Sequence, residues 1–269
     1  MKENGASLAL ARVVVVRTAF WIPCRDDLLW SAPHVMGLAR TIRRTLADLR
    51  DRAAGLSRRV HRRVPCDGLG SEYGRHTVCT EKLDANSVIY SFGLGEDISF
   101  DLALIERTGA TVYGFDPTPR SIAWVKQQAL PDRFVLGEYG IAAHDGVVRF
   151  HAPADPTHIS HSLLDERKGS GDTIEVEVRR LSTIMQQHGH QRLDVLKLDV
   201  EGAEYDVLDQ ILAERTPIDQ LLIEFHHQFA SIPAKRTVDM IAKLHEAGYD
   251  VFHVAENLRE FSLVKAEPR

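Results

Sequence analysis

Two carboxylates follow a short apolar run in this chain of 269 residues. Residues 193–198 are almost continuously apolar, which is typical of a strand buried on both faces of a parallel sheet. Asp199 and Glu201 come at its carboxyl end, ahead of Gly202 and a segment whose apolar residues recur at helical spacing. Because open α/β sheets bind ligands beyond the carboxyl ends of their strands, we expect both carboxylates to face a ligand.

The next apolar run, residues 220–225, also carries polar side chains at its end, namely Glu224, His226 and His227. Consecutive parallel strands are usually neighbours, so we expect these side chains to converge with the carboxylates that follow the earlier run. Such a group could take a proton from a hydroxyl, which is a poor nucleophile while it is neutral. We assign His226 as the general base, Asp199 as its orienting partner and His227 as an alternative base.

The same carboxylates could instead hold a divalent metal. Oxygen ligands suit Mg²⁺, and Asp199, Glu201 and Glu224 would supply them. A bound cation would lower the pKa of a hydroxyl group that contacts it. Carboxylates at a strand end also cap helices and bind amino groups, so the metal site is a secondary hypothesis.

A glycine turn follows the apolar segment 87–92. Gly93, Leu94 and Gly95 make this turn, and glycines there let the backbone approach a ligand because they lack a Cβ atom. Asp116 stands 21 residues after Gly95, where nucleoside-binding α/β folds bond ribose hydroxyls. Capping of the following helix is the alternative role of Asp116. The spacing predicts a nucleoside site.

Strands and helices alternate along the chain, which predicts an α/β fold with a mostly parallel sheet. The third strand ends at Ile141 and Ala142, where an adenine could lie. The last two strands form an antiparallel hairpin, and the polar segment 158–162 is a candidate for part of a substrate pocket. Strands are expected at 87–92, 111–115, 134–142, 173–178, 193–198, 220–225, 249–255 and 261–265, helices at 98–105, 121–130, 181–188, 203–212 and 233–247, and a further hairpin at 146–153.

The N-terminal part differs in character from the rest. Apolar residues recur at helical spacing between arginines, which predicts a basic amphipathic helix over residues 38–63. This helix could dock on the rest of the chain by its apolar stripe, make peripheral contact with an anionic membrane, or join two copies as a homodimer. Residues 64–84 are rich in glycine and are expected to form a linker or covering loop. We therefore divide the chain into a helical extension with a linker at 1–86 and a main domain at 87–269.

The formal net charge of −5 conceals an asymmetry between these parts. Residues 1–87 carry 15 Lys and Arg against 9 Asp and Glu, and the remainder carries 18 against 29. An acidic main domain lacks the basic face expected for duplex nucleic acid. Cys24, Cys66 and Cys79 are odd in number and form no CxxC pair, which argues against a disulfide framework or a structural zinc site. We expect a cytoplasmic protein without a targeting segment.

Two motifs resemble those of a known family. Residues 194–204, DVLKLDVEGAE, look like the most distinctive signature of the FkbM family of S-adenosylmethionine-dependent methyltransferases, and residues 90–95, YSFGLG, occupy the position of its first glycine motif. The resemblance covers roughly residues 87–265. It implies the Rossmann-like class I methyltransferase fold, with a seven-stranded sheet that ends in an antiparallel hairpin. It also implies O-methylation of a hydroxyl on a small molecule or glycan, with S-adenosylmethionine as the cofactor.

The resemblance further implies roles for single residues. Gly93 and Gly95 would approach the methionine part of the cofactor, with Leu94 between them, and Asp116 would hold the ribose hydroxyls. At the side of the methyl acceptor, the resemblance places Asp199, which would also border the cofactor, and Glu201.

Two residues depart from the family pattern. Ser91 stands where many such folds have an acidic residue, and Asp97 stands where a third glycine is common. Both belong to the cofactor-binding segment, so the contacts to the amino-acid end of the cofactor are open. A nicotinamide-dependent oxidoreductase also uses a glycine turn and a distant acid, but the missing third glycine and the terminal hairpin argue against it. A non-catalytic nucleotide-binding module is the remaining alternative.

Overall fold

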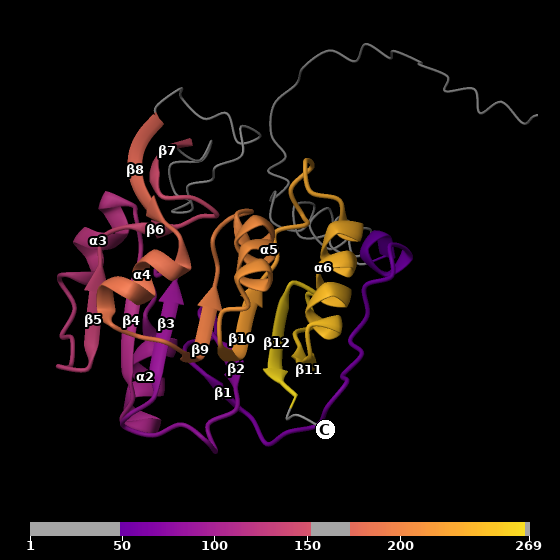
Figure 1. The fold of residues 1–269 in the computed structure, drawn as a ribbon, viewed down its shortest axis with the longest axis horizontal. Coiled ribbons are helices and arrows are strands. Elements are labelled where there is room, and N and C mark those ends of the chain that lie inside the picture. The colour runs from indigo at the N-terminus through magenta and orange to yellow at the C-terminus, as the bar shows by residue number, and fades with distance from the viewer. Residues whose placement is uncertain (1–48, 152–172, 267–269) are drawn as a thin grey trace, which may run out of the picture. The chain divides into compact units, whose positions relative to one another are not determined.

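The computed structural model describes residues 49–151 and 173–266 (Figure 1). Residues 38–48 of the helix predicted over 38–63, and the polar segment 158–162, lie outside these residues. None of the helices in the described part of the chain is long and apolar enough to cross a bilayer.

A seven-stranded sheet forms the centre of the described structure, in the order β11-β12-β10-β9-β3-β4-β5. Strand β12 pairs antiparallel with β10 and β11, and the other neighbours pair parallel. This order confirms the predicted mostly parallel sheet with a terminal antiparallel hairpin. The strands are β3 (Val88–Phe92), β4 (Thr111–Phe115), β5 (Phe134–Gly137), β9 (Leu193–Leu198), β10 (Ile218–Glu224), β11 (Tyr249–Val254) and β12 (Glu260–Lys265).

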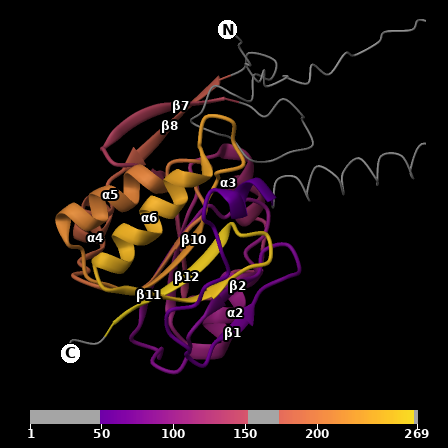
Figure 2. The ribbon, with the colours of Figure 1, turned by 90° about the vertical axis from the view of Figure 1, so that its right-hand side faces the viewer.

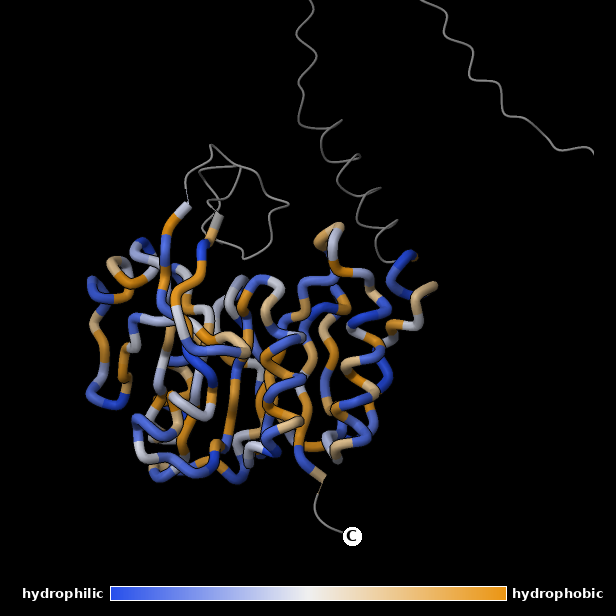
Figure 3. Tube along the Cα trace, turned by 45° about the horizontal axis from the view of Figure 1, so that its top comes forward, coloured by the Kyte–Doolittle hydropathy of each residue, from blue (hydrophilic) through white to orange (hydrophobic). Residues whose placement is uncertain are grey.

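Helices cover both faces of this sheet (Figure 2). Figure 3 shows the hydrophobic residues concentrated along the central strands, as expected for strands buried on both faces. One apolar cluster joins the sheet to α4, α5 and α6, and another joins it to α2 and to the short strand β2 (His76–Val78). The helices are α2 (Ser99–Thr108), α3 (Pro119–Val125), α4 (Leu181–His188), α5 (Glu204–Glu214) and α6 (Ala234–Glu246).

The strand predicted over 134–142 is in fact two strands in different sheets. Strand β5 ends at Gly137, where a Cβ atom would stand 2.3 Å from the ring of Phe115, so the ring packs directly on the glycine. Strand β6 (Gly140–Ile141) then joins β8 (Thr173–Arg179) and β7 (Gly146–His151) in a separate three-stranded sheet.

Two predicted helices end early. Helix α3 ends at Val125 instead of 130, and the side-chain amide of Gln128 donates a hydrogen bond of 3.0 Å to the carbonyl of Trp124 just inside its end. The basic helix is helical over residues 49–53 in its described part and does not continue to Val60. Gly55 interrupts it with a φ of 101°, in the left-handed region that ends helices.

The segment that precedes β3 packs on the sheet and its helices. Leu56 is buried in the apolar cluster of α5 and α6, and the backbone N–H groups of His61 and Arg62 donate to the carbonyl of Val251 on β11. The predicted linker or covering loop contains two short paired strands, β1 (Asp67–Leu69) and β2 (His76–Val78). Residues 49–86 are therefore part of the structure around the sheet.

Candidate active site

A pocket of about 640 Å³ opens at the carboxyl ends of β3, β4, β9 and β10. This volume lies within the range of small-molecule sites. The glycine turn after β3 and the acidic turn after β9 both line it, as does the segment 72–76, which leads into β2. The sequence-based candidates that line the pocket are Gly93, Leu94, Gly95, Asp97, Asp116, Ile141, Asp199, Glu201 and Glu224.

The glycine turn fits closely against the acidic turn. Gly93 has a φ of 83°, and a Cβ atom there would stand 1.9 Å from the backbone oxygen of Asp199. Gly95 has a φ of 54° but open space around its Cα atom. Only glycine at position 93 therefore lets the two turns meet, whereas glycine at position 95 only relieves backbone strain.

Asp116 ties the glycine turn to helix α3. One of its carboxylate oxygens accepts hydrogen bonds from the backbone N–H groups of Leu94 and Gly95, at 3.1 and 3.0 Å. The other accepts from the backbone N–H and the hydroxyl of Thr118, the residue before α3, at 2.8 and 2.6 Å. These bonds reach only the residue before α3, and the helix has no side-chain cap hydrogen bond, so the alternative role of a cap is wrong. The ribose contact stays a prediction for a side chain that lines the pocket.

Two cofactor-binding candidates lie beneath the surface of the pocket. The side chain of Ser91 is fully buried in β3, and Ala142 is buried beside β7 and β8. Neither lines the pocket, whereas Ile141 does. The structure therefore brings the first of the two adenine candidates to the pocket and not the second.

The carboxylates of Asp199, Glu201 and Glu224, here called the acidic group, face the pocket together. His226 lies behind them and is 3% exposed. Its Nε2 atom lies 3.6 Å from both Asp199 Oδ1 and Glu201 Oε2. The predicted approach of His226 to the carboxylates at the end of β9 is confirmed.

Glu204, which we did not single out from the sequence, holds His226 in place. It is fully buried in the first turn of α5. Its Oε1 atom accepts the backbone N–H of His226 at 2.8 Å and lies 3.3 Å from the ring Nδ1 atom, while Oε2 accepts the backbone N–H of Gly202 at 2.8 Å. Its place in the string KLDVEGAE was the available signal.

These neighbours decide the protonation of the acidic group and its histidine. Burial lowers the pKa of His226, but Glu204, Glu201 and Asp199 outweigh burial and raise the pKa to about 10. The imidazole therefore carries a proton at neutral pH, and because a protonated ring cannot accept another proton, this pKa argues against His226 as the general base. Burial and the charge of Asp199 raise the pKa of Glu224 to about 7.

His227 faces away from the pocket, so the predicted convergence of two imidazoles is wrong. Its Nδ1 atom lies 3.1 Å from the hydroxyl oxygen of Thr237 on α6, and its Nε2 atom lies 3.5 Å from Asp51. Burial lowers its pKa. Consecutive residues after β10 point in opposite directions, which leaves His226 alone beside the acidic group.

A second charged group, which we did not anticipate, also lines the pocket. His76, Asp97, Asp101 and Lys197 are here called the mixed-charge group, because the charge of Lys197 acts to lower the pKa values of the other three. The ammonium of Lys197 donates to the carbonyls of Gly93 at 2.8 Å and of Phe92 at 3.4 Å. Lys197 interrupts a strand that is otherwise apolar, and this exception was the signal in the sequence.

The members of the mixed-charge group differ in their protonation. Burial and the charge of Lys197 lower the pKa of His76 to about 3, so its imidazole is neutral. Burial raises the pKa of Asp101. Burial also acts to raise the pKa of Asp97, but hydrogen bonds from Ser71 and Ser99 outweigh it and lower that pKa.

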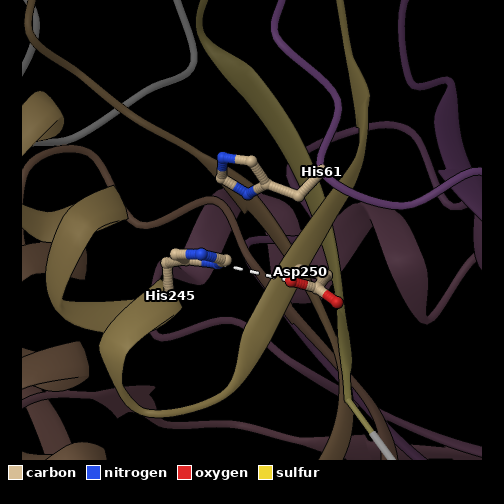
Figure 4. Close-up of side chains that lie close together, drawn as sticks. All are labelled: His61, His245 and Asp250. Atoms are coloured by element: carbon tan, nitrogen blue, oxygen red, sulfur yellow. Dashed lines mark ion pairs between the residues drawn. The ribbon is translucent and has the colours of Figure 1, made fainter.

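Possible metal ligands gather tightly at another place. Among the described residues, His61, His245 and Asp250 bring donor atoms within 4.8 Å of one another (Figure 4). His245 pairs with Asp250 at 3.3 Å and its ring lies 4.3 Å from that of His61, outside the pocket. The hypothesis of a metal on Asp199 and its neighbours stays a prediction.

Comparison with known proteins places the described fold in context. A family model, the methyltransferase FkbM domain, matches residues 76–251. The human probable methyltransferase-like protein 24 is 28% identical over 140 residues, which cover 51% of this chain and 32% of that protein. The 2-O-methyltransferase NoeI of Sinorhizobium fredii is 28% identical, over 45% of this chain and 56% of its own length.

A third relative is the 31-O-demethyl-FK506 methyltransferase FkbM of Streptomyces tacrolimicus. It is 25% identical over 184 residues, which cover 57% of this chain and 70% of that protein. The match with the human relative spans about a third of that protein's length. The family match over residues 76–251 includes most of the sheet and most of the residues that line the pocket.

Proposed function

This chain belongs to the FkbM methyltransferase family, and from that premise we propose that it transfers a methyl group from S-adenosylmethionine to a hydroxyl of a small molecule or glycan. The observation that carries the proposal is that the glycine turn, Asp116 and the acidic group all line the same pocket. Two relatives are named for methylation at oxygen. The seven-stranded sheet, in which β12 runs antiparallel between β11 and β10, is the class I methyltransferase arrangement that this family resemblance implied.

The residues around the pocket fit a nucleoside cofactor with an amino-acid tail. The glycine turn leaves no room for a side chain at Gly93, and the neighbouring carboxylate of Asp101 is buried against the pocket. Gly93 and Gly95 would border the methionine part, Asp116 the ribose and Ile141 the adenine. When bound, S-adenosylmethionine supplies a methyl group that its sulfonium has already activated.

With the donor already activated, the protein must align the acceptor and remove its proton. Glu224 is our candidate for the general base, because it lines the pocket and its pKa of about 7 is close to neutral pH. The imidazolium of His226 keeps Asp199 and Glu201 in place without touching the acceptor itself. His226 is thus a positioning residue.

Replacement of the proposed base tests this function. We expect Glu224→Gln to lower methyl transfer by about 100-fold, within the usual range for general bases, and to leave the affinity for S-adenosylhomocysteine unchanged. Transfer of labelled methyl groups to a panel of oligosaccharides and hydroxyl-bearing small molecules measures the first effect, and calorimetry measures the second. In the unchanged protein, transfer should rise with pH through about 7, because Glu224 must be ionised to accept the proton.

Glu260→Gln is the matched control. Glu260 also lines the pocket, but its carboxylate is occupied by a hydrogen bond of 2.9 Å from Asn257. Transfer at the normal rate by Glu224→Gln would overturn the assignment of the base. If the unchanged protein binds NADH and neither S-adenosylmethionine nor S-adenosylhomocysteine, the methyltransferase proposal itself fails.

The cell compartment and the partners are separate proposals. Cys66 and Cys79 are free thiols, which supports a reducing cytoplasm. Contact of residues 38–63 with an anionic membrane or with a second copy stays a prediction, since residues 38–48 lie outside the described part of the chain.

A further inference from the structure

We propose that the mixed-charge group is a receptor for an α-amino-acid zwitterion, with Asp101 binding the ammonium and Lys197 the carboxylate. This inference rests on the proposed function, because the methionine end of S-adenosylmethionine carries such a zwitterion. The proposal names residues for the contacts to the amino-acid end of the cofactor. These contacts were left open because Ser91 and Asp97 depart from the family pattern.

The first step concerns the unused carboxylate oxygen of Asp101. This residue lies in the first turn of α2, is 2% exposed and lines the pocket. Its Oδ1 atom has no hydrogen-bond partner of good geometry within the described structure, and the Ser91 hydroxyl, which acts to lower the pKa of this carboxyl, is itself fully buried. Buried polar atoms are nearly always paired in folded proteins, and an unpaired carboxylate is among the most unfavourable of them. A cation bound in the pocket would satisfy it.

The other carboxylate of this group is already satisfied. One oxygen of Asp97 accepts from the hydroxyl of Ser71 at 2.6 Å, and the other accepts from the backbone N–H of Ser99 at 2.8 Å. Asp97 therefore shapes the turn before α2. Asp101 is the carboxylate that is available to a ligand.

Ser91 explains why the negative charge for the ammonium comes from Asp101 on helix α2 and not from strand β3. The Ser91 side chain is fully buried at the end of β3, and its hydroxyl acts to lower the pKa of the Asp101 carboxyl. A hydroxyl cannot neutralise a cation, so the serine leaves the strand without the acidic side chain of the family pattern. Asp101 supplies a carboxylate to the same pocket from the neighbouring helix.

Lys197 provides the opposite charge. Two of its three N–H donors are directed to the carbonyls of Gly93 and Phe92, and the third can reach an anion in the pocket. The neutral imidazole of His76 adds no second positive charge. A lone metal cation would be repelled by Lys197 and a phosphate by the two aspartates, so a ligand with both charges suits this group best.

Calorimetry with three nucleosides separates the two contacts. S-Adenosylhomocysteine carries the ammonium and the carboxylate, decarboxylated S-adenosylmethionine carries the ammonium alone, and 5′-methylthioadenosine carries neither. We expect Asp101→Asn to lower the affinity for S-adenosylhomocysteine and for decarboxylated S-adenosylmethionine tenfold or more, since a charge-assisted hydrogen bond is lost. The affinity for 5′-methylthioadenosine should stay unchanged. Glu106→Gln is the matched control, because Glu106 is exposed on the same helix.

Each outcome decides the matter. Equal affinity of Asp101→Asn and the unchanged protein for S-adenosylhomocysteine overturns the receptor. So does an equal loss for all three nucleosides, since this would reflect damage to the pocket as a whole. If the unchanged protein binds none of the nucleosides, the proposed function fails first.

A second measurement covers the case in which Asp101→Asn does not fold. Burial raises the pKa of Asp101, so the free protein takes up a proton there at a higher pH than an exposed aspartate does. Binding of an ammonium should release this proton, and calorimetry in buffers of different ionisation enthalpy counts it. We expect proton release with S-adenosylhomocysteine and less with 5′-methylthioadenosine. Equal release with both would overturn the proposal.

Discussion

His76 and His226 are both buried beside the same pocket, with 8% and 3% exposed, yet their pKa values move in opposite directions. Burial and Lys197 lower that of His76 to about 3, while Glu204, Glu201 and Asp199 outweigh burial and raise that of His226 to about 10. Burial favours the neutral imidazole in both places, and only the carboxylates around His226 reverse this preference. Depth alone therefore does not indicate the charge of a buried histidine.

The difference separates two tasks within the pocket. The acidic group is held by an imidazolium and contains Glu224, whose pKa lies close to neutral pH, so it is suited to proton transfer. The mixed-charge group combines fixed charges of both signs and is suited to binding. The two groups come together because the turns after β3 and β9 touch at Gly93.

The largest expected effect comes from separating the two groups at that contact. In Gly93→Ala the new methyl group would overlap the backbone oxygen of Asp199, and φ would remain in the left-handed region. We expect the free energy of unfolding to fall by about 3 kcal/mol. We also expect the affinity for S-adenosylhomocysteine to fall by about 100-fold or more. Urea denaturation and calorimetry measure the two effects.

Gly95→Ala is the control for this substitution. Gly95 has the same sign of φ but nothing within 4 Å of a new Cβ atom, so only the backbone strain of about 1 kcal/mol applies. Similar effects of both substitutions would show that the contact between the turns is unimportant.

The second effect concerns the histidine of the acidic group. His226→Gln removes the positive charge between three carboxylates, and we expect it to lower the free energy of unfolding by about 3 kcal/mol at pH 7. Because the folded pKa is raised, this stabilisation is fully present below pH 6.5 and is lost as the pH rises toward 10. Chemical denaturation from pH 6 to pH 10 measures the difference in the free energy of unfolding between His226→Gln and the unchanged protein. A difference that does not change with pH would contradict this prediction.

The third and smallest effect concerns the histidine of the mixed-charge group. His76→Gln removes an imidazole that is neutral in the folded protein, so we expect a change of no more than about 1 kcal/mol at pH 7. Because the folded pKa is lowered, the contribution of His76 is present above pH 6.5 and is lost as the pH falls toward 3, by up to about 1.4 kcal/mol per pH unit.

Acid denaturation checks this third prediction. The variant should lose less stability between pH 6.5 and pH 4 than the unchanged protein does. Parallel loss in both would mean that His76 is charged in the folded protein, and its contrast with His226 would disappear.

The amino-acid sequence determined the architecture because local patterns control it. Apolar runs mark strands that are buried on both faces, helical spacing marks the helices between them, and the last two strands make the hairpin. The same patterns located Gly93, Asp116 and Asp199, because side chains at the carboxyl ends of parallel strands meet at one edge. Element order thus predicted the pocket and one wall of it.

Only the tertiary structure decided which charges face one another. His226 and His227 are consecutive in the sequence, but the turn after β10 directs one toward the acidic group and the other toward Asp51. Asp101 and Lys197 belong to a helix and a strand that are distant in the sequence, and packing across the sheet brings them to one pocket. Because a pKa depends on burial and on charges a few ångströms away, no local pattern could predict it.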